Sequence, residues 1–100
     1  MFGLKENEIA QLKCCFLKYK QIEKGIVFGS RAMGNYKKGS DVDIALVGEN
    51  ISHKIITQIL NALEETVMPY EFDLLIFNSI KNKELIRHIE EFGIEIYSTS

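Results

Sequence analysis

Residues Val27–Leu46 read VFGSRAMGNYKKGSDVDIAL, and this stretch decides the fold. Its first apolar run stops abruptly at Gly29 and Ser30, and a second apolar run follows Asp41 and Asp43. Short runs of aliphatic and β-branched residues between polar turns are typical of buried strands. The polar residues therefore lie at strand ends, where binding and catalytic side chains are commonly placed.

Helices are predicted on both sides of this stretch, because apolar residues recur there at steps of three and four. The first helix covers residues 6 to about 20. The second follows a cap at Asn50 or Ser52 and keeps its apolar period through Val67 until Pro69 interrupts it. The chain thus continues as regular structure outside the central motif.

The C-terminal part of the chain predicts two more strands and a third helix. The segments EFDLLIF (71–77) and IEIYS (94–98) are short and rich in apolar residues, as strands are. Between them, apolar residues within 85–92 have helical spacing, and Gly93 is expected to close that helix as its C′ residue. The order of elements is therefore αββαβα followed by a fourth strand.

Connection rules fix most of the topology. The strand at 41–47, the following helix and the strand at 71–77 form a β-α-β unit, which predicts parallel strands and a right-handed crossover. The run Leu74–Phe77 predicts a strand covered on both faces, either central or otherwise well covered. The C-terminal end of the strand at 25–29 meets the N-terminal ends of these two strands only if the strand at 25–29 runs antiparallel to the strand at 41–47. The predicted fold class is α/β (α+β), a mixed β-sheet with flanking helices.

Three carboxylates are predicted to converge at one end of this sheet. Asp41 and Asp43 begin one strand, and Asp73 lies near the start of its parallel neighbour. Residues i and i+2 of a strand face the same side, about 6.5–7 Å apart. Such carboxylates repel one another unless a cation neutralises them, and oxygen ligands favour Mg²⁺ or Mn²⁺. Since Mg²⁺ completes its coordination with water and phosphate oxygens, the substrate is expected to carry phosphates.

The turn at Gly29, Ser30 and Arg31 supplies groups suited to binding a nucleotide phosphate. Glycine lets the backbone approach closely, exposed amides bind anions, and the serine hydroxyl adds a donor. Arg31 adds positive charge, with packing or a partner contact as an equal alternative. A short helical turn at 31–33 would strengthen the anion site. The Gly-Ser turn and the aspartates at strand starts are each common in α/β proteins, so only their ordered combination indicates a particular kind of site.

The ordered combination of GSRAMG, SDVDIAL and EFDLLIF resembles a known family. It is similar to the Gly-Ser, Asp-x-Asp and distal Asp motifs of the polymerase β-like nucleotidyltransferases, and the short chain resembles their minimal (MNT) branch. The resemblance covers residues 26–77 well. Met33 stands where many members of the family have a second arginine.

The resemblance implies a role for each motif residue. Gly29 and Ser30 correspond to the turn that binds a nucleoside triphosphate. Asp41 and Asp43 correspond to the pair that binds two metal ions, Mg²⁺ or Mn²⁺. Asp73 corresponds to the third aspartate, which completes one metal site and helps to activate the acceptor hydroxyl. All three aspartates are thus implied to be catalytic and metal-binding.

The resemblance also implies a partner. Minimal nucleotidyltransferases commonly pair with a helical HEPN protein as antitoxin and toxin, and some of these antitoxins transfer AMP to a tyrosine of the toxin. The expected function is therefore that of an antitoxin-like adenylyltransferase that uses ATP and forms a hetero-oligomer with a HEPN-type substrate. The alternative is a non-catalytic binding module that retains the fold and neutralises its partner by complex formation.

Composition limits the other function classes. The 100 residues are 46% hydrophobic and 26% charged, which suits a single domain over 1–100 with one modest core. The formal net charge of -2 gives no general attraction to nucleic acid. No apolar run approaches the roughly 20 residues that span a bilayer, and the start lacks a signal peptide's plan. We therefore expect a cytoplasmic protein without a membrane partner.

The cysteines and histidines are predicted to have no role in a site. Cys14 and Cys15 are neighbours on a predicted helix, where adjacent side chains do not face each other, so buried or half-buried thiols are expected without a disulfide or metal. His53 and His88 lie in separate amphipathic stretches without a second ligand nearby. Surface helix positions are predicted for both.

Overall fold

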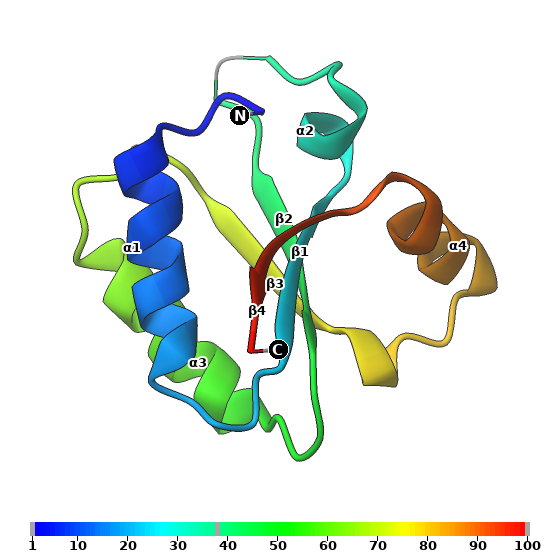
Figure 1. Cartoon of the computed structure of the whole chain (residues 1–100). Coiled ribbons are helices and arrows are strands. Elements are labelled where there is room, and N and C mark those ends of the chain that lie inside the picture. Colours follow the sequence, from blue (N-terminus) through cyan, green and yellow to red (C-terminus); the bar gives the residue numbers. More distant parts are fainter. Residues whose placement is uncertain (1, 38, 100) are drawn as a thin grey trace.

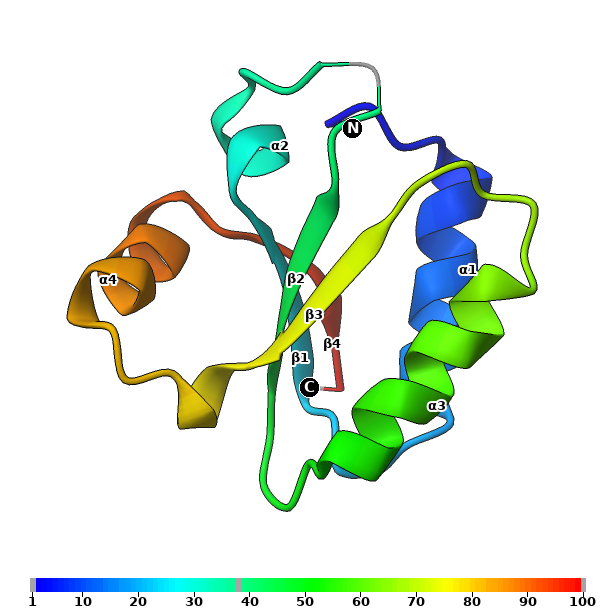
Figure 2. The same cartoon turned by 180° about the vertical axis from the view of Figure 1, so that it is seen from behind.

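The computed structural model describes residues 2–37 and 39–99, and it contains all three predicted helices and all four predicted strands (Figures 1 and 2). A short helical turn also forms after the first strand, and a 3-10 turn, η1 (Phe77–Ser79), follows the third. The elements are α1 (Glu6–Leu17), β1 (Lys24–Phe28), α2 (Ser30–Met33), β2 (Val42–Val47), α3 (His53–Glu64), β3 (Phe72–Ile76), α4 (Lys83–Phe92) and β4 (Ile94–Ser98).

The four strands form one mixed sheet in the order β3-β2-β1-β4. β1 is antiparallel to both β2 and β4, whereas β2 and β3 are parallel, as the β-α-β rule predicts. The central position considered for β3 is wrong, because β3 is an edge strand. Its apolar run is nevertheless covered on both faces: Leu74 belongs to the larger core and Leu75 packs against the smaller one.

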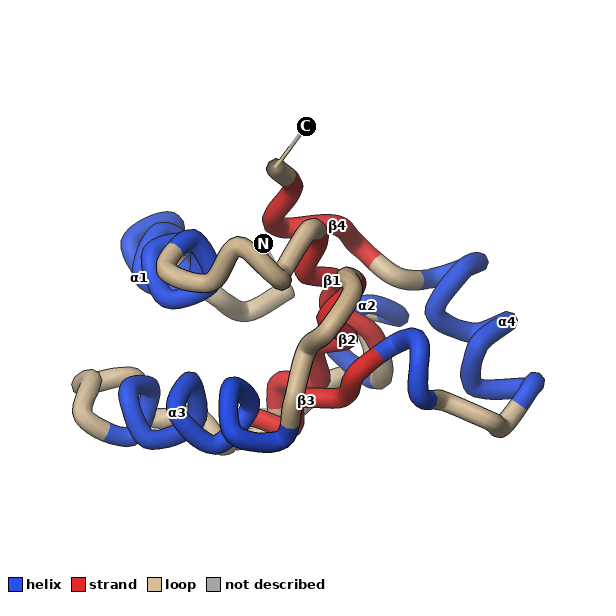
Figure 3. Tube along the Cα trace, turned by 90° about the horizontal axis from the view of Figure 1, so that it is seen from below, coloured by secondary structure: helices blue, strands red, loops and turns tan. Residues whose placement is uncertain are grey.

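The helices divide between the two faces of the sheet. α1 and α3 cover one face, and α4 lies beyond the other (Figure 3). Successive strand residues point to opposite faces, so Ile44 enters the larger core under α1 and α3, while Ala45 joins Phe28 and Ile89 in a smaller core under α4. Within residues 2–37 and 39–99, no helix combines the length and apolar character needed to cross a bilayer.

Two helix ends differ from the prediction. α1 ends at Leu17 rather than near residue 20, because the chain then turns toward β1, with the Tyr19 amide donating to the Phe16 carbonyl. α3 starts after Ser52, whose hydroxyl accepts a hydrogen bond from the Ile55 amide at 3.3 Å. The helix ends at Glu64, so Val67 lies outside it and is 94% exposed instead of continuing its apolar face.

Gly93 ends α4 as predicted, but for a different physical reason. Its φ of -63° and ψ of 144° are extended, so it does not adopt the left-handed conformation that is common for a glycine at a helix end. A Cβ at this position would collide with the Ile89 carbonyl and with the Ile26 side chain. Glycine is therefore required here by close packing rather than by backbone conformation.

The two cysteines are free thiols, as expected. Cys15 is half-buried, and burial raises the pKa of its thiol. Cys14 is exposed, which corrects the expectation that both side chains are covered. α1 therefore presents one thiol to solvent and places the other beside the larger core.

Two leucines of α1 test how far the larger core stabilises the fold. Leu12 is 0% exposed, whereas Leu17 is 70% exposed. Because Leu12→Ala leaves a cavity in packed surroundings, we expect it to lower the free energy of unfolding by about 2–5 kcal/mol. Leu17→Ala, the matched control, should change it by less than about 0.5 kcal/mol. Urea unfolding measures both, and equal losses would contradict the assignment of the core.

Candidate active site

The C-terminal end of β1 and the N-terminal ends of β2 and β3 lie together at the end of the sheet next to α2 (Figure 1), and the predicted site residues belong to these strand ends. Gly29 directly follows β1, Asp41 directly precedes β2, and Asp73 is the second residue of β3. Since Asp43 is two residues before Ala45, its side chain lies on the face of the sheet that α4 covers. The site is therefore an extension of the smaller core rather than part of the larger one.

Strand register brings two of the aspartates side by side. Asp43 pairs with Asp73 in the parallel ladder of β2 and β3, and with Phe28 in the antiparallel ladder of β1 and β2. Paired residues on neighbouring strands face the same side, and the strands are about 4.8 Å apart. Asp41 directly precedes β2, and it is close enough to Asp43 for its negative charge to act on that carboxyl group. The predicted convergence of the three residues at one end of the sheet is thus observed.

The carboxylates act on one another electrostatically. Burial raises the pKa of Asp43, and the negative charges of Asp73 and Asp41 raise it further. Within residues 2–37 and 39–99, no three potential ligand side chains are already arranged around a common metal position. The donors are nevertheless hard oxygen ligands that repel each other, so a divalent cation would relieve the repulsion while drawing them together. The donor chemistry therefore fits Mg²⁺ or Mn²⁺.

Gly29 lies directly against the Asp43 carboxylate. Its φ of 75° and ψ of -152° belong to a region that residues with a side chain rarely adopt. A Cβ built on Gly29 would collide with the carboxylate of Asp43. Ser30 follows as the first residue of α2 and is half-buried. Glycine thus satisfies both a backbone conformation and a close approach to the acidic cluster.

His88 contacts this site from α4, and it is half-buried rather than at the predicted surface position. The Gly29 amide donates a hydrogen bond to Nε2 of His88 at 3.0 Å. The imidazole also contacts the rings of Phe28 and Phe92, with centroids 6.2 and 5.6 Å away. The spacing of Leu85, His88 and Phe92 could have indicated this, because steps of three and four place all three on one helix face.

Arg31 is buried at 3% exposure, and its guanidinium binds backbone carbonyls. Nη1 donates to the Phe2 carbonyl at 3.0 Å, while Nη2 and Nε donate to the Ser40 carbonyl at 2.8 and 3.3 Å. These contacts match the packing alternative considered for Arg31. Since Ser40 directly precedes Asp41, Arg31 also fixes the backbone from which one of the carboxylates projects.

Two tyrosines complete the surroundings of Arg31. Its guanidinium carbon lies 5.1 Å from the ring centre of Tyr36 and 5.0 Å from that of Tyr70, within cation–π range. The Tyr70 hydroxyl donates to the Glu8 carboxylate at 2.9 Å. The N-terminal segment, the loop before β2 and the segment before β3 are thus joined around one buried cation.

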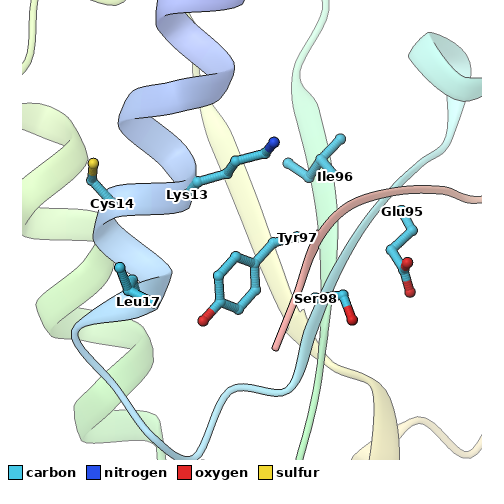
Figure 4. A pocket seen from close by; sticks show the side chains of 7 residues that line it. All are labelled: Lys13, Cys14, Leu17, Glu95, Ile96, Tyr97 and Ser98. Atoms are coloured by element: carbon cyan, nitrogen blue, oxygen red, sulfur yellow. The ribbon is translucent and has the colours of Figure 1, made fainter. Parts of the chain in front are cut away.

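A groove of about 420 Å³ lies elsewhere, between α1 and β4 (Figure 4). It is lined by Lys13, Cys14, Leu17, Glu95, Ile96, Tyr97 and Ser98. Its acidic residue, Glu95, lies 3.7 Å from Lys24 in an exposed ion pair. β4 and β3 are opposite edges of the sheet, so this groove is separate from the carboxylate cluster.

Comparison with known families agrees with this geometry. The family model described as "Polymerase beta, Nucleotidyltransferase" matches residues 10–100. The chain belongs to this family. The predicted membership of the nucleotidyltransferases and the predicted fold class are both confirmed. No curated protein sequence matches the chain significantly.

Several solved structures share this nucleotidyltransferase fold. A toxin–antitoxin complex with AMP-PNP has a TM-score of 0.74 and 21% identity, over 97% of this chain and 76% of that one. A mutant of the MntA–HpeT toxin–antitoxin pair has a TM-score of 0.71 and 18% identity, over 97% and 75%. The MNT antitoxin complex with tri-AMPylated Shewanella oneidensis HEPN toxin has a TM-score of 0.59 and 20% identity, over 99% and 74%. At such identities the likeness establishes the fold.

Alanine substitutions at Gly34 and Gly29 test the special requirement for glycine at position 29. Gly34 has a left-handed backbone, with φ 82° and ψ 5°, and a Cβ there would meet nothing within 4 Å. Gly34→Ala should therefore cost only the conformational strain, about 1–2 kcal/mol. Gly29→Ala combines a backbone region that is almost exclusive to glycine with a collision with Asp43, so it should cost about 3 kcal/mol or more. Urea unfolding of both variants measures the difference, and equal costs would contradict the requirement for glycine at position 29.

The raised pKa of Asp43 predicts how stability depends on pH in EDTA. The folded state binds the proton of the Asp43 carboxyl group more tightly than the unfolded state does. The stabilisation that this proton gives to the folded state is therefore present at low pH and is lost as the pH rises through the folded-state pKa. Asp43→Asn removes the ionisation, so it should unfold at a higher temperature than wild type at pH 7. The advantage should shrink toward pH 4. Thermal unfolding at both pH values measures it, with the exposed Glu91→Gln as control, and an equal advantage at both would contradict it.

Proposed function

We propose that the chain is a metal-dependent adenylyltransferase that moves AMP from ATP to a hydroxyl of a HEPN-type protein and thereby acts as an antitoxin. The observation that carries this proposal is the pairing of Asp43 with Asp73, with the Gly29 turn packed against Asp43. Membership of the nucleotidyltransferase family supports the reaction class. The geometry supports it because acidic ligands and a phosphate-binding turn lie at one end of the sheet.

Asp41, Asp43 and Asp73 are the residues that would hold the divalent ions. Such ions supply charge stabilisation at the phosphates and a lower pKa for the attacking hydroxyl. Asp73 comes from a different strand than the other two, and we assign it the acceptor side of the reaction. The acceptor oxygen bonds to the α-phosphorus, its proton passes to the Asp73 carboxylate, and the bond to the departing pyrophosphate breaks.

The nucleotide phosphates are assigned to the start of α2. Ser30 offers its amide and its hydroxyl there, next to the acidic cluster. We assign Arg31 an indirect role, because its guanidinium donates to the Phe2 and Ser40 carbonyls. Its effect on the reaction then passes through the position of Asp41.

The partner is proposed from the solved structures that share the fold. One of them contains AMP-PNP, and another contains a tri-AMPylated HEPN toxin. The MntA–HpeT mutant replaces two aspartates by glutamate, and those aspartates are two positions apart, as Asp41 and Asp43 are. This chain spans about three quarters of each of these relatives.

Mass spectrometry of a HEPN-type protein from the same genome, incubated with the chain, ATP and Mg²⁺, tests this function. Wild type should add the mass of AMP to the partner. Asp73→Asn should bind ATP nearly normally but transfer AMP about 100-fold more slowly, because the proton acceptor is lost. Asp43→Asn should weaken Mg²⁺-dependent ATP binding as well, since it removes a shared ligand.

The exposed Glu91→Gln is the control and should transfer AMP as wild type does. Neutralisation of the partner by wild type and both aspartate variants, without any gain in mass, would favour the non-catalytic binding module. Equal transfer by all variants would show that Asp43 and Asp73 are not active-site residues.

A further inference from the structure

The hydrogen bond between Gly29 and His88 connects the end of β1 to a helix 59 residues further along the chain. The Gly29 amide is the donor, and Nε2 of the imidazole accepts this hydrogen bond with its lone pair. α4 thereby contacts the turn that the proposed function assigns to the triphosphate. The sequence motifs of the site do not include this histidine.

This bond restricts what the turn can offer to a ligand. A backbone amide has one proton and serves one strong acceptor at a time. While His88 accepts from it, the Gly29 amide is directed toward α4, and Ser30 supplies the amide and hydroxyl that remain for phosphate. The special φ and ψ of Gly29, which keep its Cα against the Asp43 carboxylate, are stabilised by the same bond.

The imidazole is itself held in place by packing. Its ring contacts Phe28 at the end of β1 and Phe92 one turn later on α4. The first turn of α4 is capped by Asn82, whose side chain accepts hydrogen bonds from the Glu84 and Leu85 amides at 2.9 and 3.3 Å. Nε2 is therefore placed before any ligand binds, which is the requirement for preorganisation of a site.

We propose that His88 is a positioning residue for nucleotide binding. It keeps the Gly29–Ser30 turn in its triphosphate-binding conformation and remains bonded to the Gly29 amide when the nucleotide is present. This inference rests on the proposed function and deepens it, because it assigns the phosphates to Ser30 and removes the Gly29 amide from their donors. It also places α4 within the functional unit.

Two substitutions separate the hydrogen bond from the packing. His88→Phe retains an aromatic ring for Phe28 and Phe92 but removes the acceptor. His88→Gln restores an acceptor, because Oε1 of glutamine is the same number of bonds from Cα as Nε2 of histidine. The neighbouring Arg87 is exposed, so Arg87→Gln serves as the control on the same helix.

Calorimetric titration with Mg²⁺ and ATP, without an acceptor, measures the effect. His88→Phe should bind ATP about tenfold more weakly than wild type, because the turn without its hydrogen bond populates the triphosphate-binding conformation only in part. His88→Gln should stay within about threefold of wild type, and Arg87→Gln should be unchanged. The urea midpoint of His88→Phe should be lower than that of His88→Gln, because the hydrogen bond is also made in the free protein. A purely structural role of His88 would lower that midpoint but leave the ATP affinities of the folded variants equal.

The ¹⁵N resonances of His88 provide a second readout. They should show an unprotonated, hydrogen-bonded Nε2 both before and after addition of Mg²⁺ and ATP. Loss of that bond on binding, or wild-type or tighter affinity of His88→Phe, would overturn the role of His88 alone. Failure of the wild type to bind Mg²⁺ and ATP would instead overturn the proposed function, and this inference with it.

Discussion

The parallel register of β2 and β3 is the constraint on which the site depends. It places Asp43 beside Asp73, and the larger core enforces it, because Ile44 and Leu74 are the next residues and both are buried under α1 and α3. A slip of one residue would turn these apolar side chains outward and the aspartates inward. The free energy of core burial therefore also fixes the position of two carboxylates that repel each other.

The two faces of the sheet have different functions as a result. The larger core supplies most of the buried apolar side chains, whereas the smaller core under α4 contains Phe28, Ala45 and Ile89 as its buried members. Asp43 continues that second face toward the end of the sheet, where burial and neighbouring charges raise its pKa. Because its carboxylates repel one another, a cluster of this kind lowers the stability of the metal-free protein. Many functional sites reduce the stability of the fold in a similar way. The larger core compensates for it from the opposite face.

Local patterns predicted the elements and the convergence of the aspartates, because both depend on periodicity and on the β-α-β connection. Contacts between distant segments could not be predicted in the same way. The edge position of β3 follows from the pairing of β4 with β1, and the apolar run of β3 alone indicates only that both faces are covered. The end of α1 depends on where the chain must turn to reach β1. Gly93 was recognised as a helix end, but its packing against Ile26 depends on the sheet.

The same limit applies to the residues that support the site. Arg31 lies within the motif, yet its partners are the Phe2 carbonyl and the Ser40 carbonyl, and the first of these belongs to the N-terminal segment. His88 lies outside the motif and reaches Gly29 from α4. One contact fixes the backbone before Asp41 and the other fixes the turn against Asp43, so the acidic cluster is supported from both ends of the chain. A chain that kept only the motif strands would retain the aspartates but lose the hydrogen bonds that position them, which explains why the functional geometry requires the flanking segments as well.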